Sequence, residues 1–399
     1  MLTYLILCLI PLLIVHILSD LPIAVSNWEY KSRELLSLNF PSDNFYPAGS
    51  AILLLPFLWL NPNFEFVIWF YFTVAAFLYF ELTKNINKNL FRNIARMSLP
   101  LNPYLYWLCY SSQDTVFEFF LVLLFFYLLI RKRILLIAIV GILLCWTRPS
   151  YWIMFIFLPI ISLKKSESQS TLKYLFSRFM AIPLLIFTIC FNQIAYDNPS
   201  LAQEDGMTAY FSYNKYHYLS LPLFDMDVFL SEKGHMDIPD RVRHLDNPYL
   251  TMTIDSIKNN PKETILGWMQ KFDSYVFDVQ KVPHLPGKYY LSEDAKTIVI
   301  SDERLNWSLI LGNLVFEIWR TFWLVSLLIS FGVMYFMRKM SLKSMQFILP
   351  WMFGLIPGML FYTETRFKIV VEQVSVIGIA MMLQLRHKDS PKKSTSDNT

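Results

Sequence analysis

Long apolar runs recur along the whole chain, and they constrain its fold more than any other feature. A helix crosses the hydrocarbon layer of a membrane with about 20 apolar residues, and fewer suffice where neighbouring helices shield it. Ten runs approach this length: 2–18, 64–83, 94–110, 115–130, 134–147, 150–163, 179–196, 307–337, 345–362 and 367–385. Charged residues make up only 17% of the chain, against about 25% in soluble proteins. The sequence therefore predicts an all-α polytopic membrane protein with about ten transmembrane helices.

The loops between these runs differ in charge, and this difference predicts their side of the membrane. Lys and Arg are enriched in cytoplasmic loops. One set of loops holds 18 of the 35 basic residues and three acidic ones: 84–96, 131–133, 164–178, 338–343 and the tail from Arg386. The opposite set contains the segment 197–305, with 11 basic and 17 acidic residues. Both termini are therefore expected in the cytoplasm, and residues 197–306 are expected to form a large outer loop.

Two stretches depart from simple spans. The run 49–60, bounded by Pro47 and Pro62, is too short to cross and predicts a re-entrant or juxtamembrane helix in the first outer loop. Residues 134–163 have basic loops at both ends, so we expect a helical hairpin with Arg148 at its outer turn. The chain then divides into an N-terminal transmembrane module (1–196), a large extracytoplasmic loop (197–306), C-terminal transmembrane helices (307–388) and a disordered cytoplasmic tail (389–399).

No pattern of metal-binding or redox residues is present in the sequence. Cys8, Cys109, Cys145 and Cys190 lie inside apolar runs without the spacing of metal ligands, so we expect small buried side chains there. The histidines of segment 197–306 lack such spacing as well. We predict neither a metal site nor a cofactor.

A few ionisable residues lie at the outer ends of the expected spans, where charge is costly and usually functional. They are Asp20 after the first run, Asp114 between the third and fourth, Arg148 at the hairpin turn, and Glu364 and Arg366 between the last two. The topology alone places them at one depth. Carboxylates and arginines together are typical of a site with a general base and a cationic clamp for phosphate.

These residues also have simpler structural explanations. Asp20 is alternatively a solvated flank of the first helix, and Asp114 a cap of the fourth. Arg148 is alternatively a side chain that extends to the lipid headgroups.

Five further charges are interpreted as structural. Glu81, Glu118 and Glu372 lie about one turn from a helix end and are expected at the membrane interface. Glu317 and Arg320, three residues apart, are expected to pair on a helix surface.

In their order along the chain, these features resemble the membrane glycosyltransferases of the GT-C superfamily, particularly protein O-mannosyltransferases and bacterial aminoarabinose and lipid-sugar transferases. The resemblance covers roughly 1–196 and 345–385. It rests on Asp20, Tyr46-Pro47 before a short helix, the Pro-containing third span at 99–104, Asp114, Thr147-Arg148-Pro149 and the stretch Glu364–Phe367.

The sequence departs from the family at three points. Asp20 is followed by Leu21 instead of a second acidic residue, so the second carboxylate is Glu29 or absent. The last motif continues as Phe367-Lys368 where the family has a Tyr and a Pro-rich helix start. Segment 197–306 has no recognisable sugar-binding pattern.

The resemblance implies a polyprenyl-phosphate-linked sugar donor and an extracytoplasmic glycan, lipid or protein acceptor. Asp20 fits the general base and Asp114 a group that positions the acceptor or the base, while Arg366 and Arg148 fit the phosphate. Glu364 would orient Arg366 or a sugar hydroxyl. No obligatory metal is predicted, although related oligosaccharide transferases use a divalent ion.

Glu29 and Tyr46 complete the residues assigned to donor or substrate binding by this resemblance, and module 1–196 would hold most of the catalytic residues. The expected partners are the lipid-linked donor, membrane lipids and the acceptor, without nucleic acid. The expected location is the bacterial cytoplasmic membrane, with the site on its extracytoplasmic face.

Two other classes of function remain open. A lipid-linked oligosaccharide flippase or small-molecule transporter would carry polar residues near the membrane midplane. An O-antigen polymerase or ligase would also have a large outer loop, but without the early Asp. The aromatic stretch 210–218 suits sugar stacking or an interfacial belt equally well.

Overall fold

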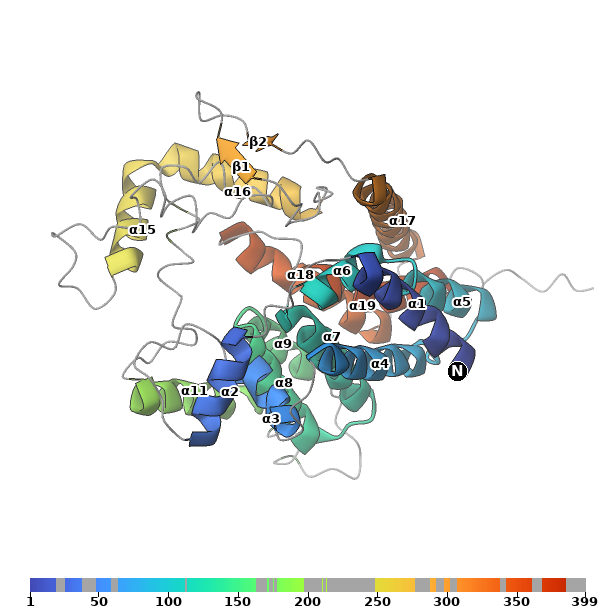
Figure 1. Cartoon of the computed structure of the whole chain (residues 1–399), viewed down its shortest axis with the longest axis horizontal. Helices are drawn as coiled ribbons and strands as arrows, with labels where there is room; N and C mark the ends of the chain where they lie inside the picture. Colours follow the sequence, from blue (N-terminus) through green and yellow to red (C-terminus); the bar gives the residue numbers. More distant parts are fainter. Residues whose placement is uncertain are drawn as a thin grey trace, which may run out of the picture.

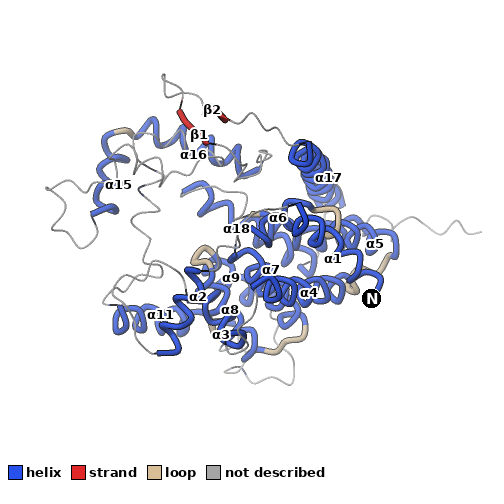
Figure 2. The backbone as a smooth tube through the Cα atoms, viewed as in Figure 1, coloured by secondary structure: helices blue, strands red, loops and turns tan. Residues whose placement is uncertain are grey.

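The structure, a computed structural model, describes residues 1–18, 26–37, 48–58, 64–111, 113–162, 171, 175, 178–196, 210, 213, 248–276, 288–291, 298–301, 307–337, 342–360 and 368–384. Across these ranges the fold is helical apart from one short hairpin (Figure 1, Figure 2). The helices are α1 (Leu2–Leu18), α2 (Ser26–Ser37), α3 (Ala48–Leu58), α4 (Phe64–Thr83), α5 (Asn89–Ser98), α6 (Pro103–Ser111), α7 (Gln113–Ile130), α8 (Ile134–Thr147), α9 (Tyr151–Ser162), α11 (Ala181–Tyr196), α15 (Pro248–Asn259), α16 (Pro261–Val276), α17 (Trp307–Met337), α18 (Leu342–Leu360) and α19 (Ile369–Leu383). The predicted helical class is confirmed.

The hairpin lies in the expected large loop and was not predicted. Strand β1 (Lys288–Leu291) pairs antiparallel with β2 (Ile298–Ser301), with Lys288 opposite Ser301. The two tyrosines of β1 and the three consecutive β-branched residues of β2 favour strands.

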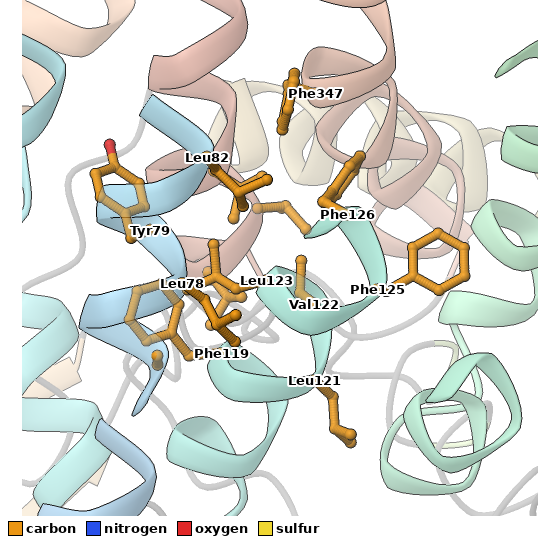
Figure 3. Close-up of a cluster of buried hydrophobic side chains, with 14 of the residues drawn as sticks. Leu78, Tyr79, Leu82, Phe119, Leu121, Val122, Leu123, Phe125, Phe126 and Phe347 are labelled. Carbon is orange, nitrogen blue, oxygen red and sulfur yellow. The ribbon is translucent and has the colours of Figure 1, made fainter. Parts of the chain in front are cut away.

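The core forms where α4, α7, α18 and α19 meet. In Figure 3, Leu78 and Leu82 of α4 lie beside Phe119 and Leu123 of α7. Phe126 of α7 stacks on Phe347 of α18 with ring centroids 4.9 Å apart. Helix α19 is buried on every side from Ile369 to Met382. A helix that is buried on every side is enclosed by its neighbours, so α19 lies at the centre of the bundle.

The expected span 94–110 is wrong, because the chain breaks there into α5 and α6. Asn102 precedes α6 and accepts a hydrogen bond from the Leu105 backbone N–H at 3.2 Å, as an N-cap does, and Pro103 takes the first helical position. The Asn102 amide also donates to Gln373 Oε1 of α19 at 3.0 Å. A polar contact to the central helix thus fixes the break in place.

Residues 134–163 form the expected pair of helices joined by a tight turn, while the outer position of this turn stays a prediction. Helix α8 ends at Thr147 and α9 begins at Tyr151, and the Tyr151 N–H donates to the Arg148 carbonyl at 3.1 Å across the turn. Gly141 of α8 faces Phe155 of α9 so closely that a Cβ would lie 2.2 Å from the ring. This glycine lets the two helices approach each other.

The run 49–60 forms helix α3, as expected. Ser32 of α2 donates to the Ala51 carbonyl at 2.7 Å, which ties α2 to α3. Gly49 lies against the last turn of α8, where a Cβ would be 2.5 Å from both the Leu143 carbonyl and the Thr147 backbone nitrogen. Helix α3 therefore begins next to the residue that precedes Arg148.

One helix is long and apolar enough to cross a membrane within the described residues, and it spans Phe66–Thr83. Several shorter apolar helices accompany it, among them Leu2–Ile17, Ile134–Thr147 and Ile369–Leu383. These helices favour association with a membrane, and the arrangement of about ten spans stays a prediction.

Candidate functional site

The candidate site joins the first turns of α7 to the turn between α8 and α9. Asp114 and Glu118 are four residues apart on α7, so their side chains share one face of the helix. Arg148, the residue after α8, bridges them. Its Nη2 lies 2.9 Å from Asp114 Oδ2, and its Nε is ion-paired with Glu118 Oε2.

Tyr151 completes this cluster from the first turn of α9. Its hydroxyl donates a hydrogen bond to Glu118 Oε1 at 2.5 Å. Arg148 itself is held by its backbone N–H, which donates to the Leu144 carbonyl at 2.9 Å. The α8–α9 turn therefore presents a cation and a hydroxyl to the same carboxylate. We call Asp114, Glu118, Arg148 and Tyr151 the carboxylate cluster.

The members of the carboxylate cluster differ in their access to the surroundings. The side chain of Glu118 is fully buried, that of Arg148 is 6% exposed, and that of Asp114 is 19% exposed. Buried charges are stable only when paired, and here two carboxylates share one guanidinium. Asp114 is therefore the most exposed member of the carboxylate cluster, and the other three are buried beside it.

These positions correct two interpretations from the sequence. Glu118 is not at an interface, since it lies inside the bundle. Arg148 does not extend outward to headgroups, since it is buried and paired with α7. A residue near the end of a helix in the sequence is not exposed when neighbouring helices extend past it.

Two elements from the N-terminal part border the carboxylate cluster. The Nδ1 atom of His16, near the end of α1, lies 2.7 Å from the hydroxyl oxygen of Tyr110. Tyr110 belongs to α6, just before α7. Helix α3 contacts the end of α8 at Gly49. The ends of α1 and α3 that flank the first predicted outer loop therefore lie near α7 and α8.

The structure brings Asp114 and Arg148 together, as the topology predicted. Asp20, Tyr46, Glu364 and Arg366 lie outside the described residues. Glu29 belongs to helix α2, but its side chain is outside the description. The roles expected for these five residues stay predictions.

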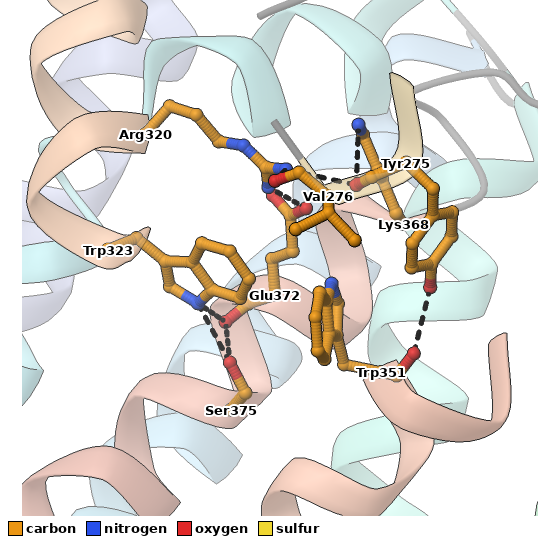
Figure 4. Close-up of polar contacts among 8 residues, drawn as sticks. All are labelled: Tyr275, Val276, Arg320, Trp323, Trp351, Lys368, Glu372 and Ser375. Atoms are coloured by element: carbon orange, nitrogen blue, oxygen red, sulfur yellow. Dashed lines mark hydrogen bonds and ion pairs between the residues drawn. The ribbon is translucent and has the colours of Figure 1, made fainter. Parts of the chain in front are cut away.

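A second buried polar cluster surrounds the C-terminal end of α16 (Figure 4). Arg320 of α17 is ion-paired with Glu372 of α19, and its Nη2 donates to the carbonyls of Tyr275 and Val276 at 3.1 and 2.8 Å. Lys368, just before α19, donates to the same Tyr275 carbonyl at 3.0 Å. We call Tyr275, Arg320, Lys368 and Glu372 the α16 anchor.

The α16 anchor corrects two more expectations. Arg320 is 1% exposed, so it does not lie on a helix surface, and it is ion-paired with Glu372 of α19. The side chain of Glu317, its expected partner, lies outside the description. Glu372 is fully buried and not at the interface. Cationic side chains at a helix C-terminus complement the carbonyls that the helix leaves unpaired, which explains both cations.

Sequence reasoning missed Glu118, Tyr151 and the α16 anchor as parts of buried polar networks. The spacing of Asp114 and Glu118 could have revealed the first, because two carboxylates on one face of an apolar helix require a common cation. The α16 anchor joins residues about 50 to 90 positions apart in the chain, and no local pattern indicates it.

Among the described residues, no three His, Cys, Asp or Glu side chains lie close enough together to hold a metal ion. Independence from metal stays a prediction. Cys8, Cys109 and Cys145 are buried as expected, but Cys190 is exposed, so the expectation of a buried side chain is wrong for Cys190.

Comparison of the chain with protein-family models, with curated proteins and with solved structures found no match.

Proposed function

We propose that the protein is a polytopic membrane glycosyltransferase that moves a sugar from a polyprenyl-phosphate donor to an extracytoplasmic glycan, lipid or protein acceptor. In this reaction the bond between the anomeric carbon and the phosphate oxygen breaks, and a bond from an acceptor oxygen to that carbon forms. The acceptor proton passes to a carboxylate, and the lipid phosphate leaves. The chemistry therefore needs a base and a cation at one site.

The distribution of apolar surface supports a membrane location. Large apolar side chains are exposed along one side of α17, at Ile318, Phe322, Val325, Leu328 and Ile329. Their spacing of three and four residues forms a continuous stripe. Contiguous apolar surface of this kind is rare on soluble monomers. With the ionisable groups of the two clusters buried inside, this arrangement suits a chain surrounded by lipid.

The single observation that carries the proposal is the buried Arg148 that bridges Asp114 and Glu118. A carboxylate that positions the acceptor or the base, which is the role expected for Asp114, must be held in one orientation while remaining accessible. Asp114 meets both conditions, because Arg148 fixes it at 2.9 Å and it keeps partial exposure. Asp20, the other expected catalytic carboxylate, follows α1 by two residues. Arg366 is the expected cation for the donor phosphate.

The contacts of Arg148 narrow its role. A guanidinium already bound to two carboxylates has less capacity left for phosphate oxygens than an uncommitted one. We therefore assign Arg148 to the orientation of Asp114 and leave the phosphate to Arg366. This assignment differs from the resemblance, which allows both arginines at the phosphate.

The test is transfer by the purified protein in lipid nanodiscs, with polyprenyl-phosphate hexoses as donors and release of polyprenyl phosphate as the signal. Asp114→Asn and Asp20→Asn are each expected to lower turnover by about 10²- to 10⁴-fold, the range of general acid–base catalysis. Glu81→Gln is the matched control, because it makes the same change in an exposed pair with Lys84. Turnover like that of the wild type in Asp114→Asn would exclude the proposed role of this residue.

The transporter alternative also has one observation in its favour. Arg320 and Glu372 form an ion pair in the interior of the C-terminal helices, where transporters place charges on a substrate path. Uptake or flipping of a lipid-linked sugar without release of polyprenyl phosphate would favour this alternative. If Arg320→Met also abolished this uptake or flipping, and neither the wild type nor the variant transferred sugar, the results would support the transporter alternative.

A further inference from the structure

The C-terminal turn of α16 is inserted among α17, α18 and the start of α19. Tyr275 is 1% exposed, although α16 belongs to the segment expected as a loop. Its hydroxyl donates to the Trp351 carbonyl of α18 at 3.0 Å, and its ring lies near the Trp351 ring (Figure 4). A loop helix that only covered the bundle would not bury a tyrosine so completely.

Helix α18 has a surface without side chains where Tyr275 enters. A Cβ at Gly354 would lie 2.5 Å from the Tyr275 hydroxyl, and one at Gly358 would lie 2.7 Å from Cδ2 of its ring. A Cβ at Gly332 of α17, by contrast, would have no neighbouring atom within 4 Å. The two glycines on α18 thus form a slot that fits the ring of Tyr275.

Two cations hold the backbone of the same residue. Arg320 and Lys368 both donate to the Tyr275 carbonyl, and both are almost fully buried. They come from α17 and from the start of α19, so three helices converge on one turn of α16. The position of Tyr275 is therefore fixed at its ring, its hydroxyl and its carbonyl.

Tyr275 also connects the α16 anchor to the carboxylate cluster. The connection runs through packing, since α18, which holds the Tyr275 ring, packs along α9, and the ring centroids of Phe353 and Phe157 lie 5.6 Å apart. Helix α9 begins at Tyr151, the hydrogen-bond partner of Glu118.

We propose that Tyr275 is a positioning residue of the candidate site: the end of α16 fixes α18, α18 packs along α9, and Tyr151 at the start of α9 in turn holds Glu118, Arg148 and Asp114 in place. Helix α16 is then part of the catalytic unit. The kinetic part of this inference rests on the proposed glycosyltransferase function, while the structural coupling does not.

The first experiment is hydrogen exchange measured by mass spectrometry on the full chain in nanodiscs. Gly358→Ala displaces the Tyr275 ring, Tyr275→Phe removes only its hydroxyl, and Gly332→Ala is the matched control. We expect faster exchange in α16 and also in peptides 113–120 and 148–155, by about tenfold in Gly358→Ala, and no change in the control. Faster exchange confined to α16, or no change at all, would overturn the proposal.

The second experiment separates positioning from general stability. Tyr275→Phe is expected to lower kcat per folded molecule about tenfold with the donor KM unchanged, because only the orientation of the carboxylates is affected. A rise in donor KM with kcat unchanged would contradict positioning. If the wild type transfers no sugar, the proposed function fails and the exchange experiment alone decides the coupling.

Discussion

Replacement of Arg148 by Met tests whether the carboxylate cluster is a real element of the fold. The substitution keeps the length and apolar stem of the side chain but removes the guanidinium that pairs with Asp114 and Glu118. Glu118 would then remain fully buried without its cation. Loss of one partner of a buried ion pair costs about 3–5 kcal/mol, because the remaining charge is uncompensated. We expect a loss near the lower end of this range, since Tyr151 still donates to Glu118.

A double variant distinguishes this cause from lost packing. Arg148→Met combined with Glu118→Gln removes both charges of the buried pair, so its loss of unfolding free energy is expected to be smaller than the sum of the two single losses. Reversible unfolding in mixed micelles, followed by far-UV circular dichroism, measures each value. Lys84→Met, which breaks the exposed pair with Glu81, is the control and should stay within about 1 kcal/mol of the wild type. A loss below about 1 kcal/mol in Arg148→Met would refute the reasoning.

Three more substitutions test the remaining parts of the fold. Burial lowers the pKa of Lys271 to about 7, so the folded state disfavours the charged form of this side chain. At pH 6, Lys271→Met should therefore unfold at a higher temperature than the wild type. This difference in unfolding temperature should become smaller as the pH rises from 7 towards 10.5. Asn102→Ala removes the cap of α6 and the contact to Gln373, and chemical unfolding should show a loss of about 1–2 kcal/mol. Gly49→Ala places a Cβ against backbone atoms of α8 and should cost about 1–3 kcal/mol in the same assay, whereas Gly332→Ala should cost little.

Helix positions follow well from the sequence, because an apolar run either fits a helix or does not. The limits of α1, α4 and α8 agree with the runs at 2–18, 64–83 and 134–147. The prediction of a single span at 94–110 was wrong because Pro100, Asn102 and Pro103 end one helix and start another. The prediction gave more weight to the hydrophobicity of this run than to these residues. Turn chemistry was therefore the better guide at that point.

The candidate site was predicted in part for a related reason. Asp114 and Arg148 were found because loop charge fixes which helix ends share a side, and the structure pairs them. The sequence-based prediction placed three buried residues at surfaces, namely Glu118, Arg320 and Glu372. It did so because it counted their distance from a helix end along the chain. Burial depends instead on which helices pack around that end, which is a property of the tertiary structure.

The charges of the two clusters bear on where a donor phosphate can bind. Asp114 and Glu118 against Arg148 leave the carboxylate cluster with an excess of one negative charge when all are ionised. Arg320 and Lys368 against Glu372 leave the α16 anchor with one positive charge, so the two clusters together are neutral when all groups are ionised. A phosphate placed on Arg148 would add negative charge to the side that already has an excess, which is unfavourable at low dielectric. The cation for the donor must therefore come from outside the carboxylate cluster, and Arg366→Ala should abolish binding of polyprenyl phosphate while Arg148→Lys lowers turnover and retains binding. Equal loss of polyprenyl phosphate binding in both variants would instead show that Arg148 contacts the donor phosphate.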